Sequence, residues 1–233
     1  MVLTTASPSS ALPPRARALP CGELIHDALV ARAGEGDRVH CPELTGHDGT
    51  GRPLKGHGHA HSLPVDLDDD KRLDHVLIFA PTGLGPVAAR AIRTLERTYT
   101  RGGVEELRVA VQAEGHREAL RRLRPGIDRL LGRPGGDRVW QSVSPFVAPR
   151  YLKPRGKNSL EGQILAELGS RGMPQAEVEV LPWGRDDLDL RHAVRTRSRG
   201  GPPPPSDCGF LVRLRFDRPL AGPLALGYGA HFG

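Results

Sequence analysis

The chain has 233 residues and a formal net charge of +6, from 33 basic and 27 acidic residues. This length allows one domain of ordinary size or two small ones, each able to bury a core. It contains no apolar run of about eighteen residues, and its first charges, Arg15 and Arg17, follow a Ser/Pro tract, whereas a signal peptide carries them in front. We therefore expect a soluble, cytoplasmic protein.

The positive charge is concentrated in the last hundred residues. Between Arg138 and Leu160 there are five basic residues and no acid, and between Arg191 and Arg218 there are seven arginines and two aspartates. Such a distribution is typical of a protein with a polyanionic partner. The alternative is a solvated arginine-rich surface, because the chain is rich in arginine throughout.

The first elements expected along the chain are a tail, a helix and a loop. Residues 1–20 predict a disordered N-terminal tail. Residues 21–34 predict a short amphipathic helix, with Ile25 and Leu29 at helical spacing. Residues 41–70 are rich in glycine and proline and have little periodicity, so we expect an extended loop. A loop of this length in a compact domain usually has a function.

Alternating strands and helices follow this loop. The apolar run 74–81 predicts a buried strand and 85–100 a helix, while 106–114 alternates like a strand with one solvated face. A further helix over 117–124 precedes a break at 132–136, where glycine and proline are frequent.

The second half of the chain repeats this pattern. Strands are expected at 138–147, 176–182 and 208–220. A helix is expected to begin after an Asn158 or Ser159 cap and to end at Gly172, and residues 222–233 form a glycine-rich tail.

The repeated β-α-β order predicts an α+β protein made of two ferredoxin-like (RRM-type) units in tandem. The first unit would span 21–135 and contain the long loop of histidines and aspartates. The second would span 136–233 and contain the basic loops and the C-terminal glycine-rich loop.

Three histidines, His57, His59 and His61, lie within five residues beside several glycines. They could bind a transition metal, although H-x-H-x-H has no fourth ligand of known position. They could also act as general acid and base, which requires only a histidine within hydrogen-bond reach of the reacting atoms. The third alternative is an exposed loop without chemistry.

The acidic stretch 66–74 partly matches a calcium-binding loop. Asp66, Asp68 and Asp70 occupy the first, third and fifth positions of an EF-hand-like loop. However, Lys71 stands where the sharp turn needs glycine, and Leu77 where a bidentate glutamate belongs. We favour a solvated loop or a cap at the start of the next strand.

The best candidate for nucleic-acid binding is the loop before the second-half helix. Its aromatic and basic side chains are Arg150, Tyr151, Lys153, Arg155 and Lys157. The basic groups would contact phosphates, and the tyrosine could stack on a base. The alternative is a charged loop without a ligand.

Two other segments could contact RNA. Arg195, Arg197 and Arg199 alternate, so on a strand they would line one face towards phosphates. In the tail, Gly227 and Gly229 would let a backbone approach RNA closely. The tail has neither a Walker lysine nor a G-x-G-x-x-G pattern, which disfavours nucleotide binding.

Four stretches together resemble the CRISPR-associated RAMP family. They are "GHDGTGRPLKGHGHAHSLPVD", "RLDHVLIFAP", "SPFVAPRYLKPRGKNSLEGQI" and "GPLALGYGAHFG". In this order, from Leu19 to Gly233, they are most similar to the Cas-six-like part of the fused Cas-five and Cas-six subunit of type I-U (I-G) systems. The fused subunit has a Cas-five-like half with no counterpart before Leu19, so we expect a stand-alone or partial Cas-six-like chain.

This resemblance implies ferredoxin-like domains, a glycine-rich loop near the C-terminus and cleavage of precursor CRISPR RNA within its repeats. The cut would use the RNA 2'-hydroxyl without a metal or cofactor, and the product would stay in the interference complex with the other effector subunits. The residues carried over are His57 and His59 as base and acid, Tyr151 and Lys153 as assistants, and His192 and His231 as reserves.

The first hypothesis is therefore a CRISPR repeat-RNA endoribonuclease. The main rival is a non-catalytic RNA-binding scaffold of the same complex, in which the histidines only contact RNA or pack. A third hypothesis is a metal-dependent nuclease that uses the histidine and aspartate loop.

Overall fold

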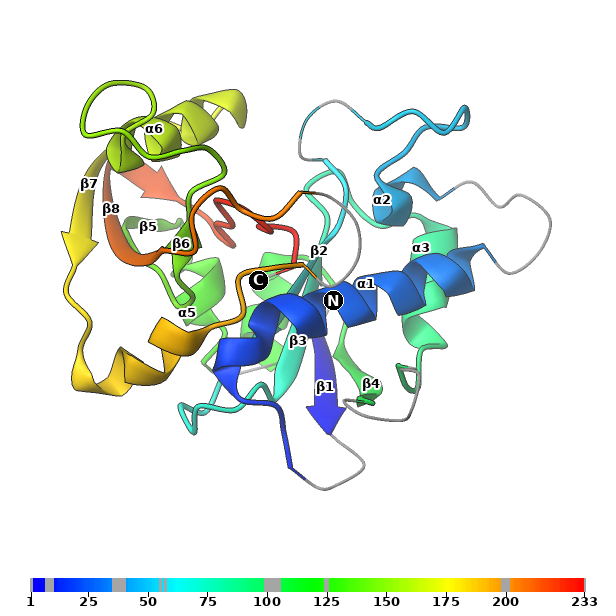
Figure 1. Cartoon of the computed structure of the whole chain (residues 1–233). Helices are drawn as coiled ribbons and strands as arrows, with labels where there is room; N and C mark the ends of the chain where they lie inside the picture. Colours follow the sequence, from blue (N-terminus) through cyan, green and yellow to red (C-terminus); the bar gives the residue numbers. More distant parts are fainter. Residues whose placement is uncertain are drawn as a thin grey trace.

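The computed structural model shows a mixed α+β protein with two antiparallel sheets (Figure 1). The structure describes residues 2–6, 11–34, 41–54, 56, 58–98, 106–123, 126–197 and 202–232. The expected α+β class is confirmed. No helix in these ranges is both long and apolar enough to cross a membrane.

The first sheet has the strand order β2-β3-β1-β4, with every neighbouring pair antiparallel. Its strands are β1 (Val2–Ala6), β2 (His61–Val65), β3 (His75–Phe79) and β4 (Arg108–Ala113). Helix α1 (Ala18–Ala33) connects β1 to β2, and α3 (Pro86–Arg93) connects β3 to β4. The chain order of this half is thus β-α-β-β-α-β.

The expected disorder of residues 1–20 is wrong for the described part of that range. Strand β1 lies inside the first sheet, between β3 and β4, and a short 3-10 helix η1 (Arg15–Arg17) leads directly into α1. The partners of β1 come from residues 75–77 and 108–113, far along the chain. Because the partners of β1 are distant in sequence, the Ser/Pro-rich composition of residues 1–20 does not indicate the strand.

Two layers of helices cover the first sheet. On one face, Ile25 and Leu29 of α1 and Ile92 of α3 are buried against Val76 and Ile78 of β3. On the other face lie α4 (Arg117–Leu123) and α5 (Asp128–Leu131), whose apolar side chains pack against β2 and β4. Helix α3 is shorter than the expected 85–100, since it ends at Arg93.

The expected extended loop over 41–70 contains two elements instead. A short helix, α2 (Pro42–Thr45), and strand β2 interrupt it. The strand is buried although it contains Pro64. Because β2 is the edge strand of its sheet, a proline can point its missing N–H outward without losing a ladder hydrogen bond.

The second sheet is built around the long strand β8 (Gly209–Leu220). On one side it pairs with β7 (Ala176–Leu181), and on the other with β5 (Asp137–Gln141) and β6 (Phe146–Val147). The expected single strand over 138–147 is therefore broken between β5 and β6. Helix α6 (Leu160–Ser170) packs on this sheet, and the expected Ser159 cap is confirmed, because its side chain accepts a hydrogen bond from Gly162 N.

The C-terminal tail, residues 221–232, runs between the two sheets (Figure 1, red). Tyr228 N donates to Val147 O of β6 at 2.8 Å, and Ser62 N of β2 donates to His231 O at 2.7 Å. A 3-10 helix η2 (Arg185–His192) adds a second connection, since Arg15 donates to Asp189 at 2.7–2.8 Å. The tail thus places residues from the end of the chain beside α1 and β2.

Candidate functional site

Three histidine rings form a stack where the tail meets the first sheet. The His231 ring lies 3.9 Å from that of His59, at an interplanar angle of 17°, and 4.1 Å from that of His61, at 28°. His61 is buried and its Nδ1 lies 3.1 Å from Ala230 O, whereas His59 and His231 keep partial exposure. We call His59, His61 and His231 the histidine stack.

Backbone contacts from three elements build this stack. Ala60 N donates to Glu43 O at 2.6 Å, which fixes the segment that carries His59 on α2. The left-handed Gly46 at the end of α2 lies against the His59 ring. The hydrogen bond between Ser62 N and His231 O then sets the tail alongside β2.

The last described residue, Phe232, is held between α1 and the segment after η2. Its ring lies edge-on to His26 at 5.3 Å, and the Arg197 guanidinium lies 4.7 Å over it. Arg197 Nε also donates to Glu23 at 2.7 Å. Burial lowers the pKa of His26; the charges of Asp27 and Glu23 oppose this shift and the charge of Arg197 adds to it, so the neutral form of His26 is favoured relative to an exposed histidine.

The face-to-face geometry of the stack is unsuited to binding one metal ion. Ring nitrogens point outward in the ring plane, so face-to-face rings cannot converge on one zinc ion at about 2 Å. Two charged imidazoles about 4 Å apart would repel by about 4 kcal/mol at an effective dielectric constant of about 20. The stack therefore disfavours two protonated rings at the same time.

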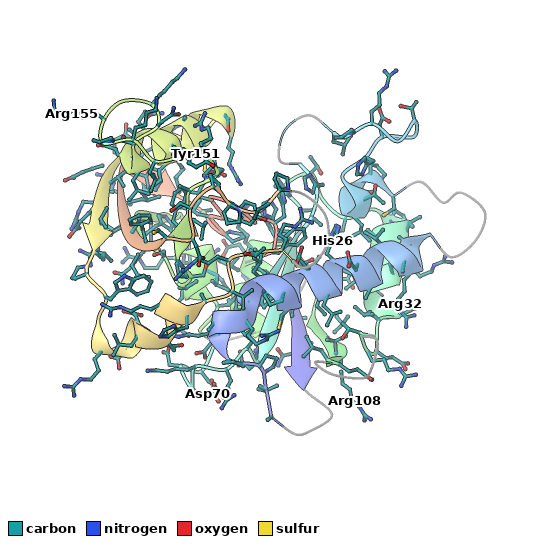
Figure 2. The ribbon with its side chains drawn as sticks, in the orientation of Figure 1. His26, Arg32, Asp70, Arg108, Tyr151 and Arg155 are labelled. Atoms are coloured by element: carbon teal, nitrogen blue, oxygen red, sulfur yellow. The ribbon has the colours of Figure 1, made fainter. Side chains whose placement is uncertain are left out.

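The predicted basic loop is exposed, and a side chain of helix α6 holds its backbone. Arg150, Tyr151, Lys153, Arg155 and Lys157 are all exposed, and Tyr151 is 74% exposed. Figure 2 shows Arg155 at the upper left edge of the molecule and Tyr151 within its upper part, near the helix that Figure 1 labels α6. No ion pair to any of these four cations is present within the described ranges.

The buried side chain of Gln163 fixes this loop. Its Oε1 accepts from Arg150 N at 3.0 Å, and its Nε2 donates to Arg150 O at 3.0 Å and to Asn158 O at 3.2 Å. Lys153 N also donates to Asn158 O at 2.9 Å. The exposed cations therefore project from a fixed backbone.

The structure brings only some of the predicted catalytic residues into contact with one another. His59 meets His231, one of the two reserves, while the other reserve, His192, is exposed on η2. Among the described residues, no ring or hydrogen-bond contact links Tyr151 or Lys153 to the stack. His57 lies outside the described residues.

The predicted row of arginines is not on a strand. Residues 193–197 are irregular, and Arg195 donates to Asp207 O at 2.8 Å and to Arg191 O at 2.5 Å. Arg197 is engaged with Glu23 and Phe232, as described above. The expected strand geometry is therefore wrong, because both side chains bind the protein itself. Arg199 lies outside the described residues.

At Gly227 and Gly229, the backbone of the tail lies close to other parts of the protein. Both residues have left-handed backbone conformations, with φ of 97° and 74°. A Cβ would lie 2.8 Å from Val147 O at Gly227 and 2.7 Å from a Leu19 methyl carbon at Gly229. These glycines are needed for the tail to pack between the two sheets.

The sequence placed His61 in the histidine cluster but did not single it out as a catalytic residue, and neither His26 nor Gly22 was predicted as a site residue. His61 shares the period-two spacing of His59, which on an extended segment places both on one side. Gly22 and His26 are four residues apart on α1, on the face that meets the tail. A glycine inside a helix was the one local sign of a close approach there.

The acidic loop brings together Asp66, Asp68 and Asp70, whose ligand atoms lie within 4.8 Å of one another. These carboxylates accept backbone hydrogen bonds inside the loop, such as Lys71 N to Asp66 at 2.8 Å. Asp74 accepts from Leu67 N at 2.9 Å instead, which matches the expected cap at the start of β3. Asp70 lies at the lower edge of the molecule and Tyr151 in its upper part (Figure 2).

A cavity of about 390 Å³ lies between β2 and the β5–β6 segment. Its walls are mainly apolar and include Leu63, Val65, Trp140 and Phe146. None of the predicted catalytic or RNA-binding residues lines it.

Comparison with known proteins gave no match: no protein-family model, no curated protein and no solved structure corresponds to this chain.

Proposed function

We propose that this chain is a metal-independent endoribonuclease that cuts CRISPR repeat RNA, as a Cas-six-like RAMP protein of a type I-U (I-G) system. The observation that supports this most directly is the contact between His59 and His231 at 3.9 Å. This contact brings His59, which the "GHGHA" motif predicts as a catalytic residue, against His231 of the glycine-rich tail. In this proposal the protein acts in the cytoplasm, keeps its product and assembles with other effector subunits.

The fold is compatible with this proposal. The order β2-β3-β1-β4 with helices after β1 and β3 is that of a ferredoxin-like unit. In the second half, β5–β6, α6, β7 and β8 follow the first β-α-β-β part of the same arrangement. We infer two ferredoxin-like units in tandem, the second represented by this part.

The chemistry needs only the chain's own residues. One ring of the stack removes the proton from the 2'-hydroxyl, whose oxygen then bonds to the neighbouring phosphorus. The bond from phosphorus to the 5'-oxygen breaks, and the second ring protonates that oxygen. The products are a 2',3'-cyclic phosphate and a free 5'-hydroxyl. Arg150, Lys153, Arg155 and Lys157 bind the flanking phosphates, and Tyr151 stacks on a base.

The test is to incubate the chain with repeat RNA from its own host in EDTA and to resolve cleavage and gel shift. The variants are His59→Ala and His231→Ala, with His192→Ala as the exposed control. Cleavage by the wild type and the control, with binding but no cleavage by the two stack variants, is expected. An RNA with a 2'-deoxy sugar at the cut should bind and stay intact.

One observation favours a second function, a non-catalytic RNA-binding scaffold. The exposed cations around Tyr151 are fixed by Gln163 independently of the histidines. Binding without cleavage by the wild type would support the scaffold. Cleavage that EDTA abolishes would instead support a metal-dependent nuclease that uses Asp66, Asp68 and Asp70.

A further inference from the structure

An ion pair between residues 174 positions apart lies beside Phe232, the residue that follows His231 of the histidine stack. Arg197 Nε donates to Glu23 Oε1 at 2.7 Å, and the two side chains are 33% and 4% exposed. Glu23 belongs to α1, whereas Arg197 belongs to the segment after η2. Because Glu23 is buried, the loss of its hydration offsets much of the attraction to Arg197, so the pair contributes little net stability.

The segment that carries Arg197 is itself fixed at several points. Val194 N donates to Ala16 O at 2.8 Å. Arg195 donates to Asp207 O at 2.8 Å and to Arg191 O at 2.5 Å. These hydrogen bonds hold the segment that carries Arg197, so its guanidinium reaches Glu23 on α1.

Arg197 also holds the tail. Its guanidinium lies 4.7 Å over the Phe232 ring, a cation–π contact, while His26 meets the same ring edge-on. Phe232 follows His231 directly, so its position sets where the His231 ring lies in the stack. A planar guanidinium can donate to a carboxylate through its edge while its face stacks on an aromatic ring, a geometry that the compact ammonium of lysine does not match.

We propose that Arg197, braced by Glu23, is a positioning residue that sets His231 against His59 through Phe232. This inference rests on the proposed ribonuclease function, since it assigns a support to the same pair of rings. Among the contacts described, Arg197 meets Glu23 and the Phe232 ring and does not touch the ring of His59 or His231. Its consequence is that Arg197 affects the chemical step and leaves RNA affinity unchanged.

The test compares Arg197→Gln and Arg197→Lys with Arg213→Gln as a matched control. Arg213 forms an ion pair with Glu179 on the second sheet, away from the tail. The first measurement, which needs no RNA, is amide hydrogen exchange at Ser62 and Phe232, whose N–H groups donate to His231 O and Gly229 O. Exchange about tenfold faster or more is expected in Arg197→Gln, because the tail opens more often.

The second measurement is the single-turnover cleavage rate and the RNA affinity, both in EDTA. Misplacement of a reacting group by about 1 Å can cost roughly a hundredfold in rate. We expect the cleavage rate of Arg197→Gln to fall at least about tenfold with an unchanged gel shift, and Arg197→Lys to recover only part of it. The control should match the wild type in both measurements.

The possible results separate the two proposals. Unchanged exchange in Arg197→Gln would overturn the positioning role. So would a loss of RNA affinity equal to the loss of rate, since Arg197 would then bind RNA directly. Faster exchange in a chain whose wild type cuts no RNA would refute the ribonuclease and leave Arg197 as a support of the tail only. Faster exchange with a normal cleavage rate would also contradict the positioning role.

Discussion

Gly22 and Phe232 touch backbone to backbone across 210 positions of the sequence. A Cβ at Gly22 would lie 2.0 Å from Phe232 O and 2.7 Å from Ser62 O. Helix α1, edge strand β2 and the tail therefore meet at one point, where only a hydrogen atom fits. The histidine stack lies beside this point, since Ser62 and Phe232 each follow one of its residues.

We predict that Gly22→Ala displaces the tail and destabilises the protein by about 1–3 kcal/mol, the usual effect of overpacking. The matched control is Gly169→Ala in α6, where the nearest atom to the added Cβ is 3.7 Å away. Since alanine favours a helix more than glycine, the control should be neutral or more stable by up to about 1 kcal/mol. Urea unfolding of both variants checks this, and equal stability of the two would contradict the close contact.

Gln163 should be needed for RNA binding although it does not face solvent. Gln163→Leu keeps the approximate volume and removes the bonds to the Arg150 and Asn158 backbone. The buried backbone groups left without these bonds should cost about 1–3 kcal/mol of stability. Because the loop is then free to move, RNA affinity should also fall. Gln175→Leu, at an exposed position, is the control and should change neither quantity.

Phosphate binding by the basic loop should appear in the salt dependence of RNA affinity. For a single strand, the slope of log K against log salt becomes shallower by about 0.7 for each phosphate that the protein no longer neutralises. Lys157→Gln should reduce the slope by this amount. Lys71→Gln has the same charge change in the acidic loop and should leave the slope as in the wild type. Equal slopes for both variants would place the RNA elsewhere.

Tyr151 allows stacking and catalysis to be distinguished. Its ring is 74% exposed and makes no described contact with the stack. Loss of a base stacked on it should cost about 1–3 kcal/mol of binding in Tyr151→Ala. Tyr151→Phe keeps the ring, so binding and cleavage should both stay normal. Slower cleavage by Tyr151→Phe with full binding would instead give the hydroxyl a chemical role.

The elements that local periodicity predicts correctly are those whose neighbours in the chain define them. Strand β3 is a short apolar run, β7 and β8 alternate, and α6 has apolar residues at helical spacing after Ser159. Strands β1 and β2 were missed because their partners, not their own composition, make them strands.

The same distinction holds for the site. His59 and the loop around Tyr151 are visible as motifs, so sequence reasoning found them. The contacts of His59 with His231 and of Glu23 with Arg197 join residues 172 and 174 positions apart, and no local pattern indicates them. The alternation of Arg195 and Arg197 predicts a strand that presents both side chains to phosphates, yet both side chains donate to groups of the protein itself.

His26 should make folding stability depend on pH. Burial lowers its pKa below the ordinary 6.5, and this effect outweighs the charges of Asp27 and Glu23, which raise the pKa. The unfolded chain therefore binds a proton near pH 6.5 that the folded chain accepts only at lower pH, so this contribution to stability is complete above pH 6.5 and is lost as the pH falls below it.

We expect the urea midpoint of the wild type to fall between about pH 7.5 and about pH 5.5 by more than that of His26→Gln. His192→Gln, which changes an exposed histidine on η2, should keep the pH dependence of the wild type. Because other histidines titrate in the same range, the difference between each variant and the wild type is the quantity to compare. An identical pH dependence for His26→Gln and the wild type would mean that His26 has the same pKa in the folded and unfolded chain, which would contradict a pKa lowered by burial.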